Sequence, residues 1–245
     1  MKVALVTGGA SGIGQAITVR LAQEGYQVVA ADRAGAHRAQ AGLHAQAGLQ
    51  NGESERVDLA HADQVSGLAE LVLSRYGRCD VLVNNAAELG IQRLAELDLG
   101  SWRRFQAVNV EAPLLLCARL MPVMAERGCG RVINVISNTV WAPPGPGMVA
   151  YITTKSALLG MTRAMAVEYG ASGITVNAVA PGLTDTPAAR SDIAGPEFER
   201  VRLTQALRRT TTPEDVADAV AYLAGDGARA LTGQAIRVDG GLVTL

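Results

Sequence analysis

The chain passes from its first predicted strand into its first predicted helix through Thr7-Gly8-Gly9-Ala10-Ser11-Gly12-Ile13-Gly14. A turn this tight needs glycine wherever a side chain would block the approach of a phosphate group. The free N–H groups and the positive end of the following helix favour an anion there. The stretch predicts a strand–turn–helix unit that binds the pyrophosphate of a dinucleotide, although a glycine-rich turn without a ligand has the same local pattern.

Outward from this turn, short β-branched runs alternate with stretches of helical period, the pattern of βαβ units in a parallel sheet. The predicted strands are Val3 to Thr7, Gln27 to Ala31, Arg56 to Leu59, Val81 to Asn84, Arg131 to Ile136, Ile174 to Ala180 and Ala235 to Val238. No internal repeat or interdomain linker is visible. The predicted fold is α/β, a Rossmann-type doubly wound parallel seven-stranded sheet, and residues 1–245 form a single domain.

Helix signals lie between these strands. Apolar residues at fourth-residue spacing from Ile13 to Leu21 predict a crossover helix that ends at Gly25, and a second helix is expected to end near Gly77. The tetrapeptide Thr212-Pro213-Glu214-Asp215 combines an N-cap residue, a proline in the first position and acids in the first turn, so a helix should follow it. A further helix is expected within Ala34 to Gly52.

Composition limits the partners. The 22 basic and 23 acidic residues are scattered along the chain, so no surface for nucleic acid or anionic lipid is expected. The three cysteines lack paired spacing, which argues against disulfides and any metal site. Charges such as Glu111 and Arg119 interrupt the apolar stretches, so no membrane-spanning segment is expected. A small molecule is the expected partner and the cytoplasm the expected location.

Asp32 lies at the end of the second predicted strand, eighteen residues after Gly14. A carboxylate at this place binds the hydroxyls of the adenosine ribose, and it repels the additional phosphate of NADP. Asp32 therefore favours NAD. Two alternatives stay open: Asp32 could be a solvated acid without function, and Arg33 could accept a phosphate.

Tyr151 and Lys155 are four residues apart in a predicted helix from Ala150 to Gly170, so they share one helix face. A free tyrosine has a pKa of about 10 and exchanges protons poorly at neutral pH. A neighbouring cation favours the phenolate and lowers that pKa, which would make the pair a general acid/base. On its own, this spacing also describes an ordinary exposed pair.

Taken together, these motifs resemble a classical short-chain dehydrogenase/reductase over essentially the whole chain. Its catalytic tetrad matches Asn109, Ser137, Tyr151 and Lys155, and its closing segment matches Val238-Asp239-Gly240-Gly241. By this resemblance the cofactor contacts are Gly8, Ser11, Gly12, Ile13, Gly14, Asp32, Asp58, Leu59, Asn85, Ala86, Tyr151, Lys155, Pro181, Gly182, Leu183 and Thr186.

The resemblance implies an NAD(H)-dependent oxidoreductase that interconverts a secondary alcohol and its ketone or aldehyde. Tyr151 would transfer the proton, Ser137 would hold the reacting oxygen, and Lys155 would tune Tyr151 and bind the nicotinamide ribose. Asn109 would keep a water that links Lys155 to solvent. Residues 1–110 would mainly bind the dinucleotide, and residues 130–245 would carry the catalytic residues, with a substrate lid at about 183–207.

The same resemblance implies a homotetramer. In this assembly, two long apolar segments of the chain, Ala107 to Met124 and Tyr151 to Tyr169, would pair with their copies in neighbouring subunits across two-fold axes.

Two departures from the family pattern affect the site. Ala87 replaces the usual glycine, which adds a methyl group beside the nicotinamide. Ser137 precedes Tyr151 by fourteen residues, where the family usually has thirteen. Either the loop Pro143 to Gly147 contains one extra residue, or Asn138 takes the role of the serine. Because Pro/Gly loops tolerate a change of length, we favour the first interpretation.

The substrate is less well defined. The segment Ser137 to Trp141 resembles that of members that act on aromatic or other ring-bearing alcohols, so Asn138, Trp141 and Met148 are the predicted substrate-pocket residues. Trp141 could equally be a core residue. The substrate could also be a sugar alcohol. Two alternative functions are the reduction of a 3-oxoacyl thioester and the sensing of a nucleotide without catalysis. A sugar-nucleotide epimerase is disfavoured, because such chains continue into a larger C-terminal domain.

Overall fold

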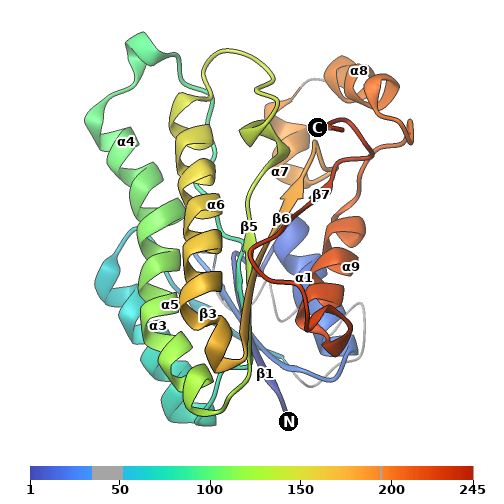
Figure 1. Cartoon of the computed structure of the whole chain (residues 1–245). Helices are drawn as coiled ribbons and strands as arrows, with labels where there is room; N and C mark the ends of the chain where they lie inside the picture. Colours follow the sequence, from blue (N-terminus) through green and yellow to red (C-terminus); the bar gives the residue numbers. More distant parts are fainter. Residues whose placement is uncertain (35–51, 194, 245) are drawn as a thin grey trace.

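The computed structural model describes residues 1–34, 52–193 and 195–244. Seven parallel strands form one sheet in the order β3-β2-β1-β4-β5-β6-β7, which confirms the predicted fold (Figure 1). The strands are β1 (Val3–Thr7), β2 (Gln27–Asp32), β3 (Gly52–Arg56), β4 (Val81–Asn84), β5 (Gly130–Val135), β6 (Ile174–Pro181) and β7 (Ala235–Val238). The strand order reverses between β1 and β4, the place where open α/β sheets bind their ligands.

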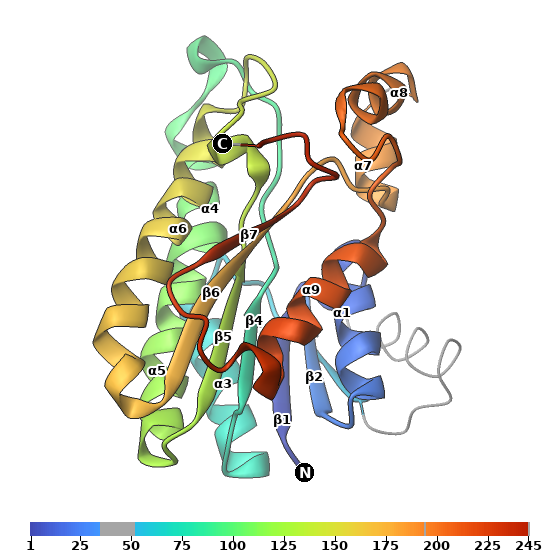
Figure 2. The same cartoon turned by 45° about the vertical axis from the view of Figure 1, so that its right-hand side comes forward.

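Helices cover both faces of the sheet, as Figures 1 and 2 show. Alternate side chains of β1 point to opposite sides: Leu5 joins the core under α3 (Ala62–Tyr76), α5 (Ala112–Glu126) and α6 (Val149–Tyr169), whereas Val6 joins the core under α1 (Gly12–Gln23) and α9 (Pro213–Ala224). A parallel sheet buried on both faces requires apolar residues at successive positions, which is why its strands are recognisable as continuous apolar runs.

The predicted helix ends are confirmed. Gly77 follows α3 in the left-handed conformation, with φ of +64°. At the start of α9, the Thr212 N–H donates to Asp215 Oδ2 at 2.8 Å, which completes a capping box. The helix expected within Ala34 to Gly52 falls on residues 35–51, outside the described residues.

The prediction of the third strand is wrong in position. The structure has β3 at Gly52–Arg56, whereas the sequence predicted Arg56 to Leu59. β3 lies at the edge of the sheet and is polar, with Glu53 and Glu55 both paired to Arg75 of α3. The apolar residues Val57 and Leu59 follow the strand and are buried in the loop beyond it.

The longest helix bears on the expectation that no segment spans a membrane. α4 (Leu99–Gln106), a π-helical turn (Ala107–Glu111) and α5 run on without interruption over Leu99–Glu126. By length and composition alone this helix could cross a membrane, despite Glu111 and Arg119, and it is the one such candidate in the described ranges. This indication is weak, because half of its apolar window is buried and α5 belongs to the core.

The carboxyl ends of the strands carry the irregular segments. A short helical turn (Asn138–Val140) follows β5, and α7 (Pro187–Asp192) and α8 (Gly195–Thr204) follow β6 and stand beyond this edge of the sheet (Figure 2). Within the predicted lid, residues 183–207, the only strand-like pairing described is the isolated bridge from Thr184 to Thr211.

Candidate active site

The glycine turn after β1 has the geometry that its sequence predicts. Gly8 adopts φ of +64°, and a Cβ atom on Gly14 would lie 1.9 Å from the Gly8 carbonyl oxygen. Only glycine therefore allows the turn to close onto α1. Ser11 is the N-cap residue of α1, and its side chain caps no N–H group there. The helix N-terminus keeps donors available for an anion, so these residues fit the pyrophosphate of a dinucleotide.

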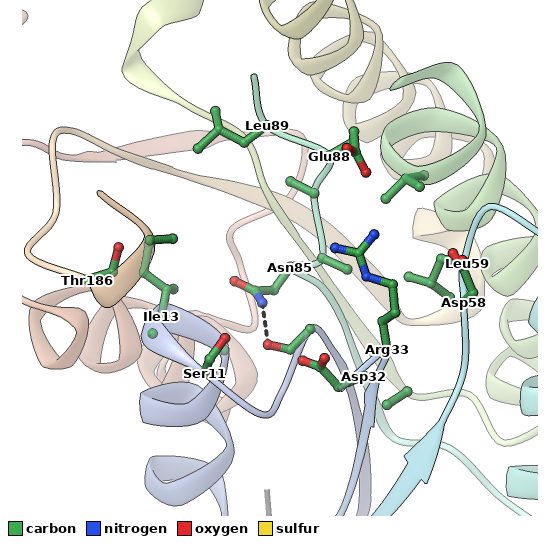
Figure 3. Close-up of a pocket in the computed structure, with 18 of the residues that line it drawn as sticks. Ser11, Ile13, Asp32, Arg33, Asp58, Leu59, Asn85, Glu88, Leu89 and Thr186 are labelled. Atoms are coloured by element: carbon green, nitrogen blue, oxygen red, sulfur yellow. Dashed lines mark hydrogen bonds between the residues drawn. The ribbon is translucent and has the colours of Figure 1, made fainter. Parts of the chain in front are cut away.

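An open cleft of about 410 Å³ lies over this turn, between the ends of β1, β2 and β4 (Figure 3). Twelve predicted cofactor residues line it: Gly8, Ser11, Gly12, Ile13, Gly14, Asp32, Asp58, Leu59, Asn85, Ala86, Tyr151 and Thr186. The other four, Lys155, Pro181, Gly182 and Leu183, do not line it. The sequence did not single out Val57, Glu88, Leu89, Arg104, Val108, Pro187 or Ala188, which also line the cleft.

Asn85 braces the glycine turn. Its side-chain amide donates to the carbonyl oxygens of Thr7 and Gly8 at 2.8 and 3.2 Å, the second drawn in Figure 3. Its backbone N–H donates to Thr7 Oγ1 at 3.0 Å. The amide of Asn85 therefore ties β4 to the turn. Its contact with the cofactor stays a prediction.

The carboxylate of Asp32 is held in place at one end of the cleft. It accepts N–H groups from Ala10 at 3.1 Å and from Ala34 at 2.9 Å. Neighbouring Arg33 is exposed and extends across the cleft in Figure 3. Asp32, which favours NAD, and Arg33, which could accept the additional phosphate of NADP, thus lie at the same end of the cleft.

Arg104 forms part of the wall that the sequence did not predict. Its Nε donates to Glu88 at 2.9 Å, and its Nη2 lies 3.8 Å from Asp58 Oδ1. The N–H of Ala60 and, to a smaller extent, the Arg104 guanidinium lower the pKa of Asp58. Arg104 belongs to no motif and meets these acids only through the fold, so the sequence carries no signal for it.

Asn109 is fully buried on the π-helical turn. Its Oδ1 accepts the Glu88 N–H at 2.7 Å, while its Nδ2 donates to the Glu88 carbonyl at 3.0 Å and to Thr154 Oγ1 at 2.9 Å. Thr154 precedes Lys155 on α6. Asn109 therefore connects the loop after β4 with the helix that carries Tyr151 and Lys155. A π-helical turn is common at functional sites.

Tyr151 and Lys155 share one face of α6, as predicted. Lys155 is 2% exposed, its ammonium donates to the Val135 carbonyl at 2.7 Å, and Nζ lies 5.7 Å from the centre of the Tyr151 ring. Burial lowers the pKa of Lys155 to about 8. Burial raises the pKa of Tyr151 to about 12, and a hydrogen bond between Tyr151 and Ser137 opposes this. The expected net lowering of the Tyr151 pKa is therefore not found, because desolvation by burial is the largest effect and raises it.

The structure brings Ser137, not Asn138, to Tyr151. The Ser137 side chain interacts with the Tyr151 hydroxyl group. Asn138 is 5% exposed, and its Nδ2 donates to Asp239 Oδ2 at 3.3 Å. The extra residue before Tyr151 is therefore accommodated in the following loop.

The predicted substrate-pocket residues Asn138, Trp141 and Met148 do not line the cleft. Trp141 packs against the small core of Ile136, Leu158 and Leu159, with the Arg237 guanidinium 5.4 Å from its ring centre. Of the two interpretations of Trp141, this packing favours the core residue.

The start of the predicted lid borders the cleft. Thr186 Oγ1 accepts the Ala189 N–H at 3.1 Å and so caps α7. Gly182 packs closely on Asp239, since a Cβ atom there would lie 2.8 Å from Asp239 Cβ. Across the described ranges, no group of three His, Cys, Asp or Glu residues is arranged to hold a metal ion.

Comparisons with known proteins agree with this geometry. A family model described as enoyl-(acyl carrier protein) reductase matches residues 8–243. The 3-oxoacyl-[acyl-carrier-protein] reductase FabG of Staphylococcus aureus is 37% identical over 251 residues, which cover 98% of each chain. A short-chain dehydrogenase/reductase structure from Serratia marcescens is 36% identical with a TM-score of 0.92, covering 99% of this chain and 98% of that one.

A second solved structure carries a cofactor in its name. It is a single-substitution variant of the actinorhodin polyketide ketoreductase with NADPH, 35% identical with a TM-score of 0.90, covering 98% of this chain and 97% of that one. Together with the family model and the whole-length relatives, it identifies the class of protein. The chain belongs to the short-chain dehydrogenase/reductase family, whose members are oxidoreductases that bind a nicotinamide cofactor.

Proposed function

We propose that the chain reduces the 3-oxo group of acyl thioesters to a 3-hydroxyl group. The observation that carries this proposal is the cluster of Ser137, Tyr151 and Lys155, with Tyr151 lining the dinucleotide cleft. The choice of substrate rests on relatives named as a 3-oxoacyl-[acyl-carrier-protein] reductase and a polyketide ketoreductase. It replaces the oxidation of a secondary alcohol as the first candidate.

The residues of the chain perform the proton chemistry. A bound nicotinamide supplies the hydride. Tyr151 donates a proton to the carbonyl oxygen, and its pKa of about 12 keeps that proton in place at neutral pH. Ser137 donates a hydrogen bond to the same oxygen as negative charge develops on it. Lys155, with a pKa of about 8, is largely an ammonium ion at neutral pH and stabilises the phenolate left behind.

We propose NAD as the cofactor. The glycine turn would hold the pyrophosphate, and Asp58 with Leu59 the adenine. Asp32 would accept the ribose hydroxyls, and its carboxylate in the cleft disfavours an additional phosphate. Arg33, next to Asp32 in the cleft wall, is the cation that could offset this repulsion.

Oxidation of a ring-bearing secondary alcohol is the second candidate. Leu89 lines the cleft and is 48% exposed, so an apolar ring would fit there as well as an acyl chain. We further propose a cytoplasmic homotetramer with the division of labour that the sequence implies, residues 1–110 for the dinucleotide and 130–245 for catalysis. Exposed Leu114 and Val167, on α5 and α6, support an interface there.

The proposal is tested with 3-oxobutanoyl-CoA as substrate, with NADH or NADPH, by following the loss of cofactor absorbance. A parallel panel of aromatic and cyclic secondary alcohols is incubated with NAD. Turnover of the thioester with kcat/KM well above that of any alcohol supports the first candidate. Turnover of alcohols alone would establish the second, and no turnover of either with Tyr151 intact would contradict both.

A further inference from the structure

We propose that Thr139 is a positioning residue that turns the hydroxyl group of Ser137 toward the reacting oxygen. Thr139 lies in the helical turn Asn138–Val140, two residues beyond Ser137. It neither lines the cleft nor belongs to the tetrad predicted from the sequence. The inference rests on the proposed function, because it concerns the donor that Ser137 offers to a carbonyl oxygen.

Thr139 makes two hydrogen bonds to one oxygen atom. Its backbone N–H donates to Ser137 Oγ at 3.2 Å, and its Oγ1 donates to Ser137 Oγ at 2.9 Å. Ser137 is 7% exposed and is the N-cap residue of the turn, so water has little access to compete for these contacts.

The hydrogen-bonding capacity of a serine hydroxyl fixes the consequence. The group has one hydrogen to donate and two lone pairs that accept. The Thr139 N–H can only donate, so it takes one lone pair, and the Thr139 hydroxyl takes the second. Ser137 is then left with its own hydrogen, which is free to point at Tyr151 or at a substrate oxygen beside it.

The contact between Ser137 and Tyr151 is consistent with this direction. Ser137 lowers the pKa of Tyr151, against the larger effect of burial. A hydrogen bond donated to the phenolate has this effect, whereas one that favours the neutral phenol has the opposite effect. This is the effect expected if Ser137 donates toward the place where the oxygen is to react.

The next residue keeps the turn in position. Asn138 is buried and donates to Asp239, which also accepts the N–H groups of Gly241 at 3.0 Å and Val243 at 3.1 Å. The turn is thus attached to the C-terminal segment. With Ser137 and Asn138 both fixed, the orientation of the Ser137 hydrogen depends on Thr139.

The test compares two substitutions of Thr139 that each remove one of its two side-chain groups. Thr139→Val keeps the β-branched shape and removes the hydroxyl, while Thr139→Ser keeps the hydroxyl and removes the methyl. We expect Thr139→Val to lower kcat roughly 3- to 10-fold, the factor for losing one neutral hydrogen bond. The Kd of NADH and the Tm should stay unchanged. Thr139→Ser should restore kcat to within about twofold of the unmodified enzyme, because the bond to Ser137 is retained.

A double-mutant cycle separates positioning from a structural effect. In a Ser137→Ala background, Thr139→Val should have no further effect on kcat, since there is no hydroxyl left to orient. An unchanged kcat in Thr139→Val, or an equal loss in both backgrounds, would overturn the inference. Failure of the proposed function is a different result: the unmodified enzyme would then not reduce the thioester.

Discussion

Burying the ammonium of Lys155 should cost the protein stability, and replacing it by methionine should recover part of that cost. Lys155 is almost completely buried, and desolvation lowers its pKa from 10.5 to about 8. At about 1.4 kcal/mol per tenfold change in proton affinity, this difference amounts to about 3 kcal/mol. Methionine fills a similar volume but leaves the Val135 carbonyl without its ammonium donor, so the net gain of Lys155→Met at pH 7 is smaller.

The pH dependence of the free energy of unfolding isolates the cost of burying the Lys155 charge from the other effects of the substitution. Because the folded-state pKa lies below the unfolded value, the unfolded chain binds more protons between pH 8 and pH 10.5. The free energy of unfolding of the unmodified protein should therefore rise with pH in this window. Relative to Lys155→Met it should gain about 2 to 3 kcal/mol between pH 7 and pH 10, where the lysine penalty has mostly vanished.

The assay is urea unfolding at several pH values and a fixed protomer concentration, since assembly makes apparent stability concentration-dependent. Lys2→Met is the matched control, because the Lys2 side chain is 52% exposed and should give a nearly pH-independent difference. If the difference between Lys155→Met and the unmodified protein does not change from pH 7 to pH 10, the ammonium is not desolvated as inferred.

Three further outcomes are expected of the site and one of the assembly. Asp32→Ala should narrow the gap in kcat/KM between NADH and NADPH, and a preference for NADPH in the unmodified enzyme would contradict the role given to Asp32. Tyr151→Phe should lower kcat by roughly 10²- to 10⁴-fold with unchanged NADH affinity, and full activity would refute the acid role. Any oxidation of an alcohol should accelerate from pH 7 to pH 10 more than the reduction does, because the pKa of Tyr151 is raised to about 12 and oxidation needs the phenolate. Sedimentation at micromolar concentration should give four subunits, and a monomer would exclude the proposed interface.

The fold could be predicted from the sequence where interactions between residues close in the chain determine the local structure. The turn from Gly8 to Gly14 is restricted to glycine by its own backbone, and the capping box at Thr212 is made within one helical turn, so both leave a pattern that can be read without the structure. β3 could not be located in this way. Its edge position allows charged residues, and the apolar run that was taken for the strand is the loop after it.

The candidate site shows the same division. The positions of Tyr151, Lys155 and Ser137 follow from helical spacing and family resemblance, and the fold brings them together as expected. Arg104 was missed because its partners Glu88 and Asp58 come from loops far from it in the chain and form no pattern in the sequence. The direction of the Tyr151 pKa was missed for another reason: spacing indicates which charge is near, whereas burial depends on the packing around both groups.

Burial affects the two main groups of the site in opposite directions, and both effects suit reduction. Desolvation always favours the uncharged form, so it strengthens the hold of Tyr151 on its proton and weakens that of Lys155. At neutral pH the tyrosine is therefore a proton donor in place beside the cleft. In the proposed reduction that proton would go to a carbonyl oxygen, and the phenolate formed would lie near the Lys155 ammonium, whose bond to the Val135 carbonyl does not neutralise its charge. In the proposed mechanism, the buried charge that destabilises the resting protein would thus be the one that stabilises the phenolate formed in the reaction.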